Sequence, residues 1–360
     1  MTEPKAAKIY VGMSGGVDSS LTAALLVEQG YKVTGVYMKN WTQDLPGMKC
    51  PWADDLADAK RVAVQLGIDF KVFDFENGYR HKVVDYMIDE YKRGRTPNPD
   101  IMCNQEVKFK LFLDSALEDG ADMIATGHYA RISSNEYANK STSARLEMAV
   151  DKLKDQTYFL YRITGEALSK TLFPLGELTK PQVRTMAKER RLYTAAKKDS
   201  QGICFVGQIG VRDFLRQYVD TKPGDIIDKK TGKKLGVHDG AIFYTLGQRH
   251  GMELGGGLPY YVVGKDMDKS EVYVTTDLND GSLWKDEVKL SSIHWINGPP
   301  SDGEYDIRVR HRAHLVKARL SYRPNEVTLL ELSNPERAVA AGQSVVMYHN
   351  DICLGGGIVI

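Results

Sequence analysis

The segment SGGVDSS, at residues 14–20, has residue types that can bind phosphate. It stands between an apolar run and an amphipathic stretch, which predicts a strand-to-helix junction. Backbone N–H groups at the start of a helix bind phosphate oxygens, because they have no acceptor within the helix. Gly15 and Gly16 allow a sharp turn and a close backbone approach, and the serines add hydroxyl donors. The pattern favours a phosphate-binding loop over a simple tight turn.

This loop differs from two common nucleotide-binding motifs. It has no lysine of the GxxxxGK[ST] kind, and GMSGG lacks the GxGxxG spacing of dinucleotide-binding loops. It resembles the SGGxDS signature of the adenylating ATP pyrophosphatases, which use ATP to make an AMP-activated intermediate and release pyrophosphate. This resemblance implies that Asp18 helps to position a magnesium-bound pyrophosphate.

Two of the four cysteines stand in surroundings that favour a thiolate. Cys103 lies at the start of a predicted helix that carries Lys108 and Lys110, and Cys204 follows two lysines. A helix N-terminus and nearby cations both lower the pKa of a thiol, so these cysteines suit redox or sulfur-transfer chemistry. Cys204 also lies in the apolar string ICFV, where a cysteine can be a small buried hydrophobe. Spacing alone leaves open whether the two thiols meet.

The remaining histidine and cysteine candidates are interpreted as structural residues rather than as metal ligands or catalytic groups. A zinc site is not predicted, because no C-x-x-C pair or comparable Cys and His cluster is present. His128, at the end of a predicted strand, is expected to be a hydrogen-bonding group rather than a catalytic base. Cys50 and Cys353 are expected to be ordinary structural residues.

Length and composition restrict the class of protein. A chain of 360 residues predicts two or three domains. Lys and Arg total 48 against 47 Asp and Glu, so nucleic-acid binding would require a local basic face. No run approaches the ~20 apolar residues that span a bilayer, and no signal peptide is evident. Four scattered cysteines argue against a secreted disulfide scaffold, and we expect a reducing, cytoplasmic location without a membrane partner.

The elements that position these residues follow from hydrophobic periodicity. From Lys8, short β-branched runs alternate with longer amphipathic stretches. Further strands are predicted at 70–75 and 121–128, with helices at 53–66, 78–93 and 105–119. Such alternation predicts an α/β fold with a doubly wound parallel sheet. The two prolines of TPNPD predict an ordered loop between two helices.

The pattern changes after about residue 205 to short strands separated by turns. We therefore expect a catalytic domain at 1–205, a small connecting domain at 206–284 and a β-barrel-like domain at 285–360. The last domain carries a basic strand cluster, which is interpreted either as a phosphate-tracking face or as a solvated strand face. Its members are Arg308, Arg310, Arg312, Lys317, Arg319 and Arg323.

Seven motifs then occur in a fixed order along most of the chain. They are SGGVDSS, GVYMKNW, TPNPDIMCNQEVKF, ATGHYARI, KDQTYFLYRI, KKDSQGICFVG and YTLGQRHG. Together they resemble the tRNA-specific 2-thiouridylase family. The resemblance implies an ATP pyrophosphatase fold and an enzyme that uses ATP and Mg²⁺ to replace the C2 oxygen of the wobble uridine of tRNA with sulfur.

The same resemblance implies roles for individual residues. ATP would be bound by Gly12, Met13, Ser14, Gly15, Gly16, Val17, Asp18, Ser19, Met38 and Gly127. The target base would contact Asn98, Pro99 and Asp100, with Asp100 as the proton-transfer group. Other contacts to tRNA would come from Lys154, Asp155, Gln156, Arg310 and His311.

The implied chemistry uses both cysteines. Cys204 would carry a persulfide delivered by a Tus-type relay protein or a cysteine desulfurase. Cys103 would cleave that persulfide, which leaves a transient Cys103 to Cys204 disulfide. Adenylation suits this reaction, because it turns the C2 oxygen, a poor leaving group, into part of a departing AMP. The resemblance also implies lysine, glutamate and glutamine tRNAs as substrates.

Two other functions remain open from the sequence. The protein could be an ATP pyrophosphatase that activates a small carbonyl substrate for amination, with the cysteine pair incidental. It could also be a tRNA-binding protein whose ATP site is regulatory. Pyrophosphate release in the presence of ATP and tRNA distinguishes the second alternative from both enzymes.

Overall fold

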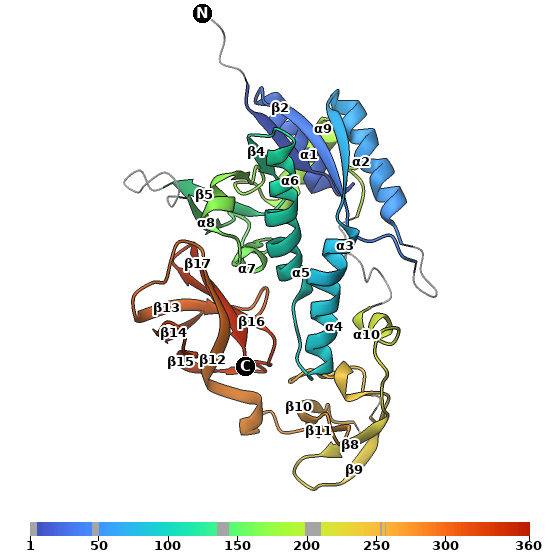
Figure 1. Cartoon of the computed structure of the whole chain (residues 1–360). Coiled ribbons are helices and arrows are strands. Elements are labelled where there is room, and N and C mark those ends of the chain that lie inside the picture. Colours follow the sequence, from blue (N-terminus) through green and yellow to red (C-terminus); the bar gives the residue numbers. More distant parts are fainter. Residues whose placement is uncertain (1–5, 45–49, 135–143, 199–209, 253, 256) are drawn as a thin grey trace, which may run out of the picture.

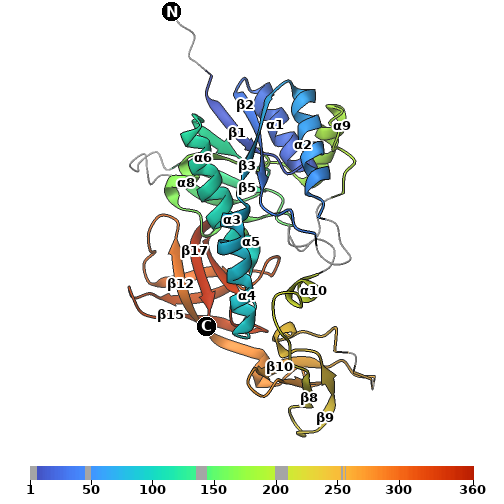
Figure 2. The same ribbon diagram turned by 45° about the vertical axis from the view of Figure 1, so that its right-hand side comes forward.

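The computed structural model describes residues 6–44, 50–134, 144–198, 210–252, 254–255 and 257–360. An α/β part, a small sheet and a β-barrel follow one another along the chain, and a pair of helices runs from the α/β part toward the small sheet (Figures 1 and 2). No described helix has the length and apolar character needed to cross a membrane.

The N-terminal part is built on a five-stranded parallel sheet in the order β3-β2-β1-β4-β7. Its strands are β1 (Lys8–Gly12), β2 (Lys32–Lys39), β3 (Asp69–Asp74), β4 (Met123–Ala125) and β7 (Thr171–Leu172). The middle of β2 is buried at five successive residues, as expected for a parallel strand that helices cover on both faces. The predicted doubly wound sheet is confirmed.

Three helices flank the phosphate-loop side of this sheet. They are α1 (Val17–Glu28), α2 (Trp52–Leu66) and α9 (Lys180–Glu189). The predicted helix at 53–66 matches α2, which ends where Gly67 adopts the left-handed conformation with φ of 66°. Helix α9 starts with a capping box, in which Thr179 and Gln182 satisfy each other's backbone N–H groups. This capping box fixes the positions of the residues in the first turn of α9.

A helical arm contains both remaining predicted helices. It is formed by α3 (Glu76–Tyr79), the π-helical η1 (Arg80–Val84), α4 (Asp85–Lys92), α5 (Pro99–Met102), the π-helical η2 (Cys103–Leu111) and α6 (Phe112–Glu118). The predicted loop between its halves is ordered. There the backbone N–H of Thr96 donates to the carbonyl of Ala341, 2.8 Å away, and the Thr96 and Thr245 hydroxyls lie 3.0 Å apart. Both later parts of the chain therefore hold this loop.

The middle part is a four-stranded sheet in the order β10-β11-β8-β9. Its strands are β8 (Gly224–Asp228), β9 (Lys234–His238), β10 (Tyr261–Asp266) and β11 (Glu271–Thr275). Strands β8 and β11 pair in parallel, and the other neighbours are antiparallel. The short α10 (Val211–Leu215) precedes this sheet. The side chains of Val262, Val272 and Val274 belong to its own apolar core.

The C-terminal part is a closed barrel. Its strands are β12 (Trp284–Trp295), β13 (Gly303–Arg308), β14 (Val316–Ser321), β15 (Thr328–Arg337), β16 (Ser344–His349) and β17 (Ile352–Val359). Pairing of β12 with both β15 and β17 closes the ring, so these strands leave no open edge between them. The predicted C-terminal β-barrel is confirmed.

A hairpin from the α/β part extends the barrel sheet. Strands β5 (Ala130–Ser134) and β6 (Ala144–Met148) pair with each other, and β6 pairs with β17 through Leu146 and Cys353. The short helices α7 (Thr157–Leu160) and α8 (Gly165–Ser169) follow it. Sequence periodicity did not predict this pairing, because the partner strands are more than 200 residues apart.

A buried ion pair joins the same two parts. The Oδ2 atom of Asp155, just before α7, lies 3.0 Å from a guanidinium nitrogen of Arg308, at the end of β13. The side chain of Asp155 is 0% exposed and that of Arg308 is 9% exposed. Asp155 also accepts hydrogen bonds from the Thr157 hydroxyl and the Ala149 N–H. A buried charge with so many partners fixes the hairpin against the barrel.

We expect Asp155→Asn to lower the free energy of unfolding by about 3–5 kcal/mol, because it leaves the buried Arg308 charge without its counterion. The matched control is Asp306→Asn, whose partner Lys317 is 3.1 Å away and 53% exposed. The control should cost less than about 1 kcal/mol. Urea unfolding of both variants measures the difference, and equal losses would contradict the structural role of the buried pair.

Candidate functional site

One cavity of about 460 Å³ opens at the carboxyl ends of the parallel strands. Residues at the ends of β1, β2 and β4 and at the start of α1 line it, which is where ligands bind in open α/β sheets. Residues from the helical arm and from the barrel line its other walls. Segments from three distant parts of the chain therefore meet at one concave site.

The phosphate loop forms the floor of the cavity. Gly15 has φ of 72°, and a Cβ atom there would lie 2.4 Å from the carbonyl oxygen of Asp55 in α2. The Ser19 hydroxyl donates to the Gly16 carbonyl, 3.1 Å away, and accepts from the Ser14 N–H at 3.2 Å. Gly16 is the N-cap residue of α1 and has an extended conformation, with φ of −96° and ψ of 164°. The loop thus presents the start of α1 toward the cavity, as phosphate binding requires.

Asp18, in the first turn of α1, is neutralised within the site. Lys180 places its Nζ 2.7 and 2.8 Å from the two carboxylate oxygens of Asp18, and the Tyr129 hydroxyl donates to Asp18 at 2.9 Å. The Lys180 side chain is 12% exposed and projects from the capped start of α9. A carboxylate and an ammonium at the phosphate loop are suited to a metal-bound polyphosphate.

The residues predicted to bind ATP converge on this cavity. With the exception of Gly15, all of them line it. Met38 contributes from β2, and Gly127 follows β4. A Cβ atom on Gly127 would lie 2.9 Å from the backbone of Asp18 and Ser19, so only glycine allows this close contact. The structure brings nine of the ten predicted residues together around one cavity.

Cys103 lines the cavity from the helical arm and is 5% exposed. It begins the π-helical segment η2, in which residues five apart share a face. That geometry places Lys108 on the same face, and both side chains line the cavity. π-Helical segments of this kind are frequent at functional sites. Cys204, the other predicted catalytic thiol, lies outside the described residues.

His128 has the structural surroundings that were predicted for it. Its Nδ1 lies 2.7 Å from the Thr126 hydroxyl, and its Nε2 lies 3.5 Å from the Lys108 ammonium. Burial, together with the charge of Lys108, lowers the pKa of His128 well below its ordinary value. The imidazole of His128 is therefore uncharged at physiological pH. It can accept a hydrogen bond at this wall but adds no positive charge to it.

The three residues predicted to contact the target base form the start of α5. The Asn98 side chain caps this helix by accepting from the Asp100 and Ile101 N–H groups, and Pro99 is buried at its first position. Burial raises the pKa of Asp100, and the charge of Lys108 partly offsets that rise. Within the described chain these residues are not part of the cavity lining, but α5 leads directly into Cys103.

Most of the residues predicted to contact tRNA lie at the barrel side of the cavity. Lys154, Gln156 and His311 line it, and Arg310, which directly precedes His311, is exposed. The His311 ring centroid lies 4.4 Å from that of Phe159. Burial lowers the pKa of His311 to about 4, and nearby arginines add to the effect. His311 is therefore an uncharged aromatic group at neutral pH.

Two expectations about the RNA-facing residues need correction. Asp155 is buried in the ion pair with Arg308, so neither side chain is available for RNA in this structure. The basic strand cluster is also not one free face. Lys317 pairs with Asp306 at 3.1 Å, and Arg323 pairs with Asp302 at 2.7 Å. The two aspartates lie in β13 or directly before it, and periodicity along one strand does not reveal such partners.

Several residues of the cavity were absent from the sequence prediction. Among them are Asp55, Tyr129 and Lys180. Lys180 had the clearest signal, since it stands at the start of a predictable capping box, TKPQ. Cys50 also lines the cavity, and burial raises the pKa of its thiol, in keeping with the structural role predicted for it. Only the fold brings these positions next to the phosphate loop.

Comparison with known proteins covers all three parts. Residues 7–208 match the family described as tRNA methyl transferase HUP domain, residues 212–276 the tRNA methyl transferase PRC-barrel domain, and residues 285–359 the aminomethyltransferase beta-barrel domain. A protein of Idiomarina loihiensis named tRNA-specific 2-thiouridylase MnmA is 44% identical over 362 residues, covering 98% of this chain and 95% of that protein. The protein of the same name from Bacillus subtilis is also 44% identical, covering 99% of this chain and 95% of that protein.

We expect Gly15→Ala to abolish most nucleotide binding, because its Cβ would clash with the Asp55 carbonyl at 2.4 Å. The matched control is Gly30→Ala, where φ is also positive, at 84°, but no atom lies within 4 Å of the new Cβ. The control should lose about 1–2 kcal/mol of stability and keep its affinity for ATP. Calorimetric titration with ATP measures both variants, and equal affinities would contradict the loop assignment.

Proposed function

The chain belongs to the tRNA-specific 2-thiouridylase family, and from this premise we propose that it converts the wobble uridine of tRNA to 2-thiouridine with release of AMP and pyrophosphate. The observation that carries the proposal is the single cavity shared by the phosphate loop, Cys103 and Lys154. An adenylation site, a thiol and an RNA-facing group are the three parts that this reaction requires, and the cavity unites them.

ATP binds with its phosphates on the loop from Gly12 to Ser19 and its nucleoside against Met38 and Gly127. The loop amides at the start of α1 hold phosphate oxygens, and the cavity volume of about 460 Å³ suits a nucleotide. The Asp18 carboxylate lines this cavity, and a Mg²⁺ ion bound with the phosphates would use the lone pairs that Lys180 and Tyr129 leave on its oxygens. When bound, Mg²⁺ offsets phosphate charge and favours the departure of pyrophosphate.

The target uridine enters beside α5 and is activated there. Its C2 oxygen attacks the α-phosphorus of ATP, forming an O–P bond as pyrophosphate leaves. Asp100 accepts the N3 proton of the base in this step and returns it when the thiocarbonyl forms. The raised pKa of Asp100 supports that role, because a carboxyl group with a pKa closer to neutrality exchanges protons more readily. Asn98 and Pro99 would orient the base.

Sulfur transfer follows from a persulfide on Cys204. The terminal sulfur of the persulfide attacks C2, and the Cys103 thiolate then attacks the Cys204 sulfur. The S–S bond of the persulfide breaks, its electron pair forms the C2 thiocarbonyl, and AMP leaves. The Cys103 to Cys204 disulfide that results requires a two-electron reductant before the next cycle. Lys108, on the same π-helical face as Cys103, supports the thiolate by its charge.

Residues 285–360 would act with Lys154 and Gln156 to hold the tRNA, while residues 1–205 carry the catalysis and 206–284 connect them. Arg310 would form an ion pair with a phosphate of the RNA backbone. His311 would offer an uncharged ring, beside Phe159, for contact with the RNA. Asp155 acts indirectly, by fixing these groups through Arg308. The substrate tRNAs would be those for lysine, glutamate and glutamine. A Tus-type relay protein or a cysteine desulfurase would supply sulfur, in the cytoplasm.

Nucleoside mass spectrometry of unmodified tRNA, incubated with protein, ATP, Mg²⁺ and a persulfide donor, tests the proposal. We expect 2-thiouridine with the wild type and a loss of at least about 100-fold with Cys103→Ala or Cys204→Ala, because each removes a thiol that forms a covalent bond in the reaction. Cys353→Ala, at a buried thiol outside the cavity, is the control and should keep activity. Absence of thiolated base with the wild type would reject the function.

The salt dependence of tRNA binding separates charge from ring contacts. Arg310→Ala should reduce the slope of log Kd against log salt by about 0.7–0.9, because one phosphate contact is lost. His311→Ala should weaken binding at pH 7.5 without changing that slope, because burial holds the pKa of His311 at about 4 and its ring is neutral. Filter binding between 50 and 300 mM salt measures both, and equal slope changes would contradict a neutral His311.

A further inference from the structure

The turn that follows β13 brings an arginine of the barrel to the nucleotide cavity. The backbone N–H of Ala313 donates to the carbonyl of Arg310, 3.1 Å away, which closes a turn with His311 and Arg312 in its middle. Both middle residues line the cavity, and they are the contribution of the barrel to its described lining. Arg312 therefore borders the same space as the phosphate loop.

Arg312 has a backbone conformation that arginine seldom adopts. Its φ is 62°, and it stands at the third position of the turn, where a positive φ normally selects glycine or asparagine. An L residue in this left-handed region is strained, because its Cβ atom approaches a backbone carbonyl oxygen. Residues in such conformations cluster at active sites and ligand contacts. Because glycine would form the same turn without strain, the arginine is explained by a function of its side chain.

The residues on both sides of Arg312 are held in place. The ring centroid of His311 lies 4.4 Å from that of Phe159 in α7, and Ala313 packs against the apolar core of the barrel. The carbonyl of Phe159 in turn accepts a hydrogen bond at 3.0 Å from the side chain of Asn104 in η2. The turn is thus fixed between the barrel, α7 and the helical arm, so Arg312 is positioned before any ligand binds.

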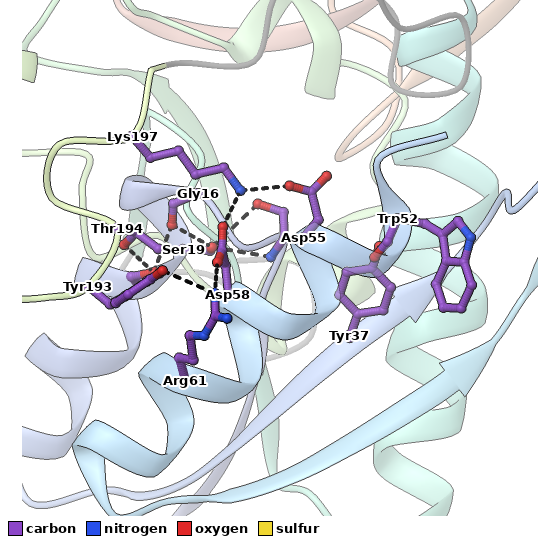
Figure 3. A network of polar contacts seen from close by, with 12 residues as sticks. Gly16, Ser19, Tyr37, Trp52, Asp55, Asp58, Arg61, Tyr193, Thr194 and Lys197 are labelled. Carbon is purple, nitrogen blue, oxygen red and sulfur yellow. Dashed lines mark hydrogen bonds and ion pairs between the residues drawn. The ribbon is translucent and has the colours of Figure 1, made fainter. Parts of the chain in front are cut away.

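The charge of Arg312 is not balanced by a carboxylate among the described residues. The side chain is exposed and makes neither an ion pair nor a hydrogen bond within that part of the chain. Two cations beside the phosphate loop are already paired. The Lys180 Nζ lies 2.7 Å from Asp18. The Lys197 Nζ lies 2.7 Å from Asp55 (Figure 3). Because a guanidinium binds phosphate oxygens through two parallel N–H donors, Arg312 adds an uncommitted phosphate-binding group to the cavity.

We propose that Arg312 is a catalytic residue that the barrel supplies to the polyphosphate of ATP bound on the phosphate loop. The inference rests on the proposed function and concerns its adenylation step. In that step the C2 oxygen of the uridine forms a bond to the α-phosphorus, while Asp100 accepts the N3 proton. The bond from the α-phosphorus to the oxygen that bridges to the β-phosphate breaks, and pyrophosphate leaves with its electron pair. Negative charge thus grows on the pyrophosphate, and a fixed guanidinium beside it stabilises that charge.

The position of Arg312 favours the nucleotide over a phosphate of the RNA backbone. Arg310, at the first position of the same turn, is exposed and is not among the described residues that line the cavity, whereas Arg312 is. The phosphate loop from Gly12 to Ser19 lines that cavity too, so Arg312 and the loop can bind one polyphosphate. The two arginines then bind different substrates, and the docking of tRNA on the turn is linked to completion of the phosphate site.

The test is single-turnover release of pyrophosphate with saturating ATP and unmodified tRNA, without a sulfur donor. We expect Arg312→Gly to lower the rate by at least about 100-fold, the cost of losing one fixed donor to a developing charge. Arg312→Lys, which keeps the charge but not the parallel donors, should recover part of the rate. The affinity for tRNA and its salt dependence, from filter binding, should stay at the wild-type values. The melting temperature of Arg312→Gly should not fall, because glycine adopts a positive φ without strain.

Two variants in the barrel are matched controls. Asn325→Gly changes another exposed residue with a positive φ, 66°, to glycine. Lys289→Met removes an exposed cation that lies 3.5 Å from Glu287 on the same strand. Both variants should release pyrophosphate at the wild-type rate.

Three results would overturn the inference. The first is a folded Arg312→Gly variant that releases pyrophosphate at the wild-type rate. The second is an unchanged rate at saturating tRNA together with a salt slope of tRNA binding reduced by about 0.7–0.9, which would assign Arg312 to an RNA phosphate. The third is a loss of rate accompanied by a lower melting temperature, which would make Arg312 a structural residue. A wild type that releases no pyrophosphate with ATP and tRNA contradicts the proposed function instead.

Discussion

The structure depends on the close approach between the phosphate loop and the start of α2. Gly15 lies so near the Asp55 carbonyl that no side chain fits between them. This contact fixes the loop in the shape that presents the amides of α1, and it also places the Asp55 side chain at the cavity. Asp55 in turn binds Lys197 across the rim of the cavity. One backbone contact thus helps to order both the phosphate loop and the start of α2.

The wall of the cavity that the helical arm forms depends on how the three parts of the chain hold that arm. The loop between α4 and α5 is bonded to the barrel through Ala341 and to the middle part through Thr245. Beyond that loop, the π-helical geometry of η2 turns Cys103 and Lys108 to one face. In the proposed sulfur transfer a rigid arm is useful, because a thiol that attacks a persulfide must be held within bonding distance while water is excluded.

In the region predicted to contact tRNA, the buried charged residues have a structural role, and their neighbours line the cavity. Asp155 and Arg308 occupy the interior and join the β5–β6 hairpin to the barrel, whereas Lys154 and Gln156, the neighbours of Asp155 in sequence, line the cavity. Residues that are adjacent in sequence thus have different surroundings, because only Asp155 is turned to the buried Arg308. The neutral His311 ring beside Phe159 adds a contact of a different kind from the exposed charge of Arg310.

The sequence by itself determined the parallel sheet, the phosphate loop, the ordered loop before Cys103 and the barrel, because each depends on local periodicity or on glycine and proline at specific positions. Only the tertiary structure decided which charged side chains are paired with each other and which remain available to bind a ligand. Lys317 and Arg323 are paired with aspartates from elsewhere in the barrel, and Lys180 meets Asp18 across 162 positions of sequence. The β6–β17 pairing likewise joins distant segments. Such contacts have no local signal, since burial and pairing depend on neighbours that the fold supplies.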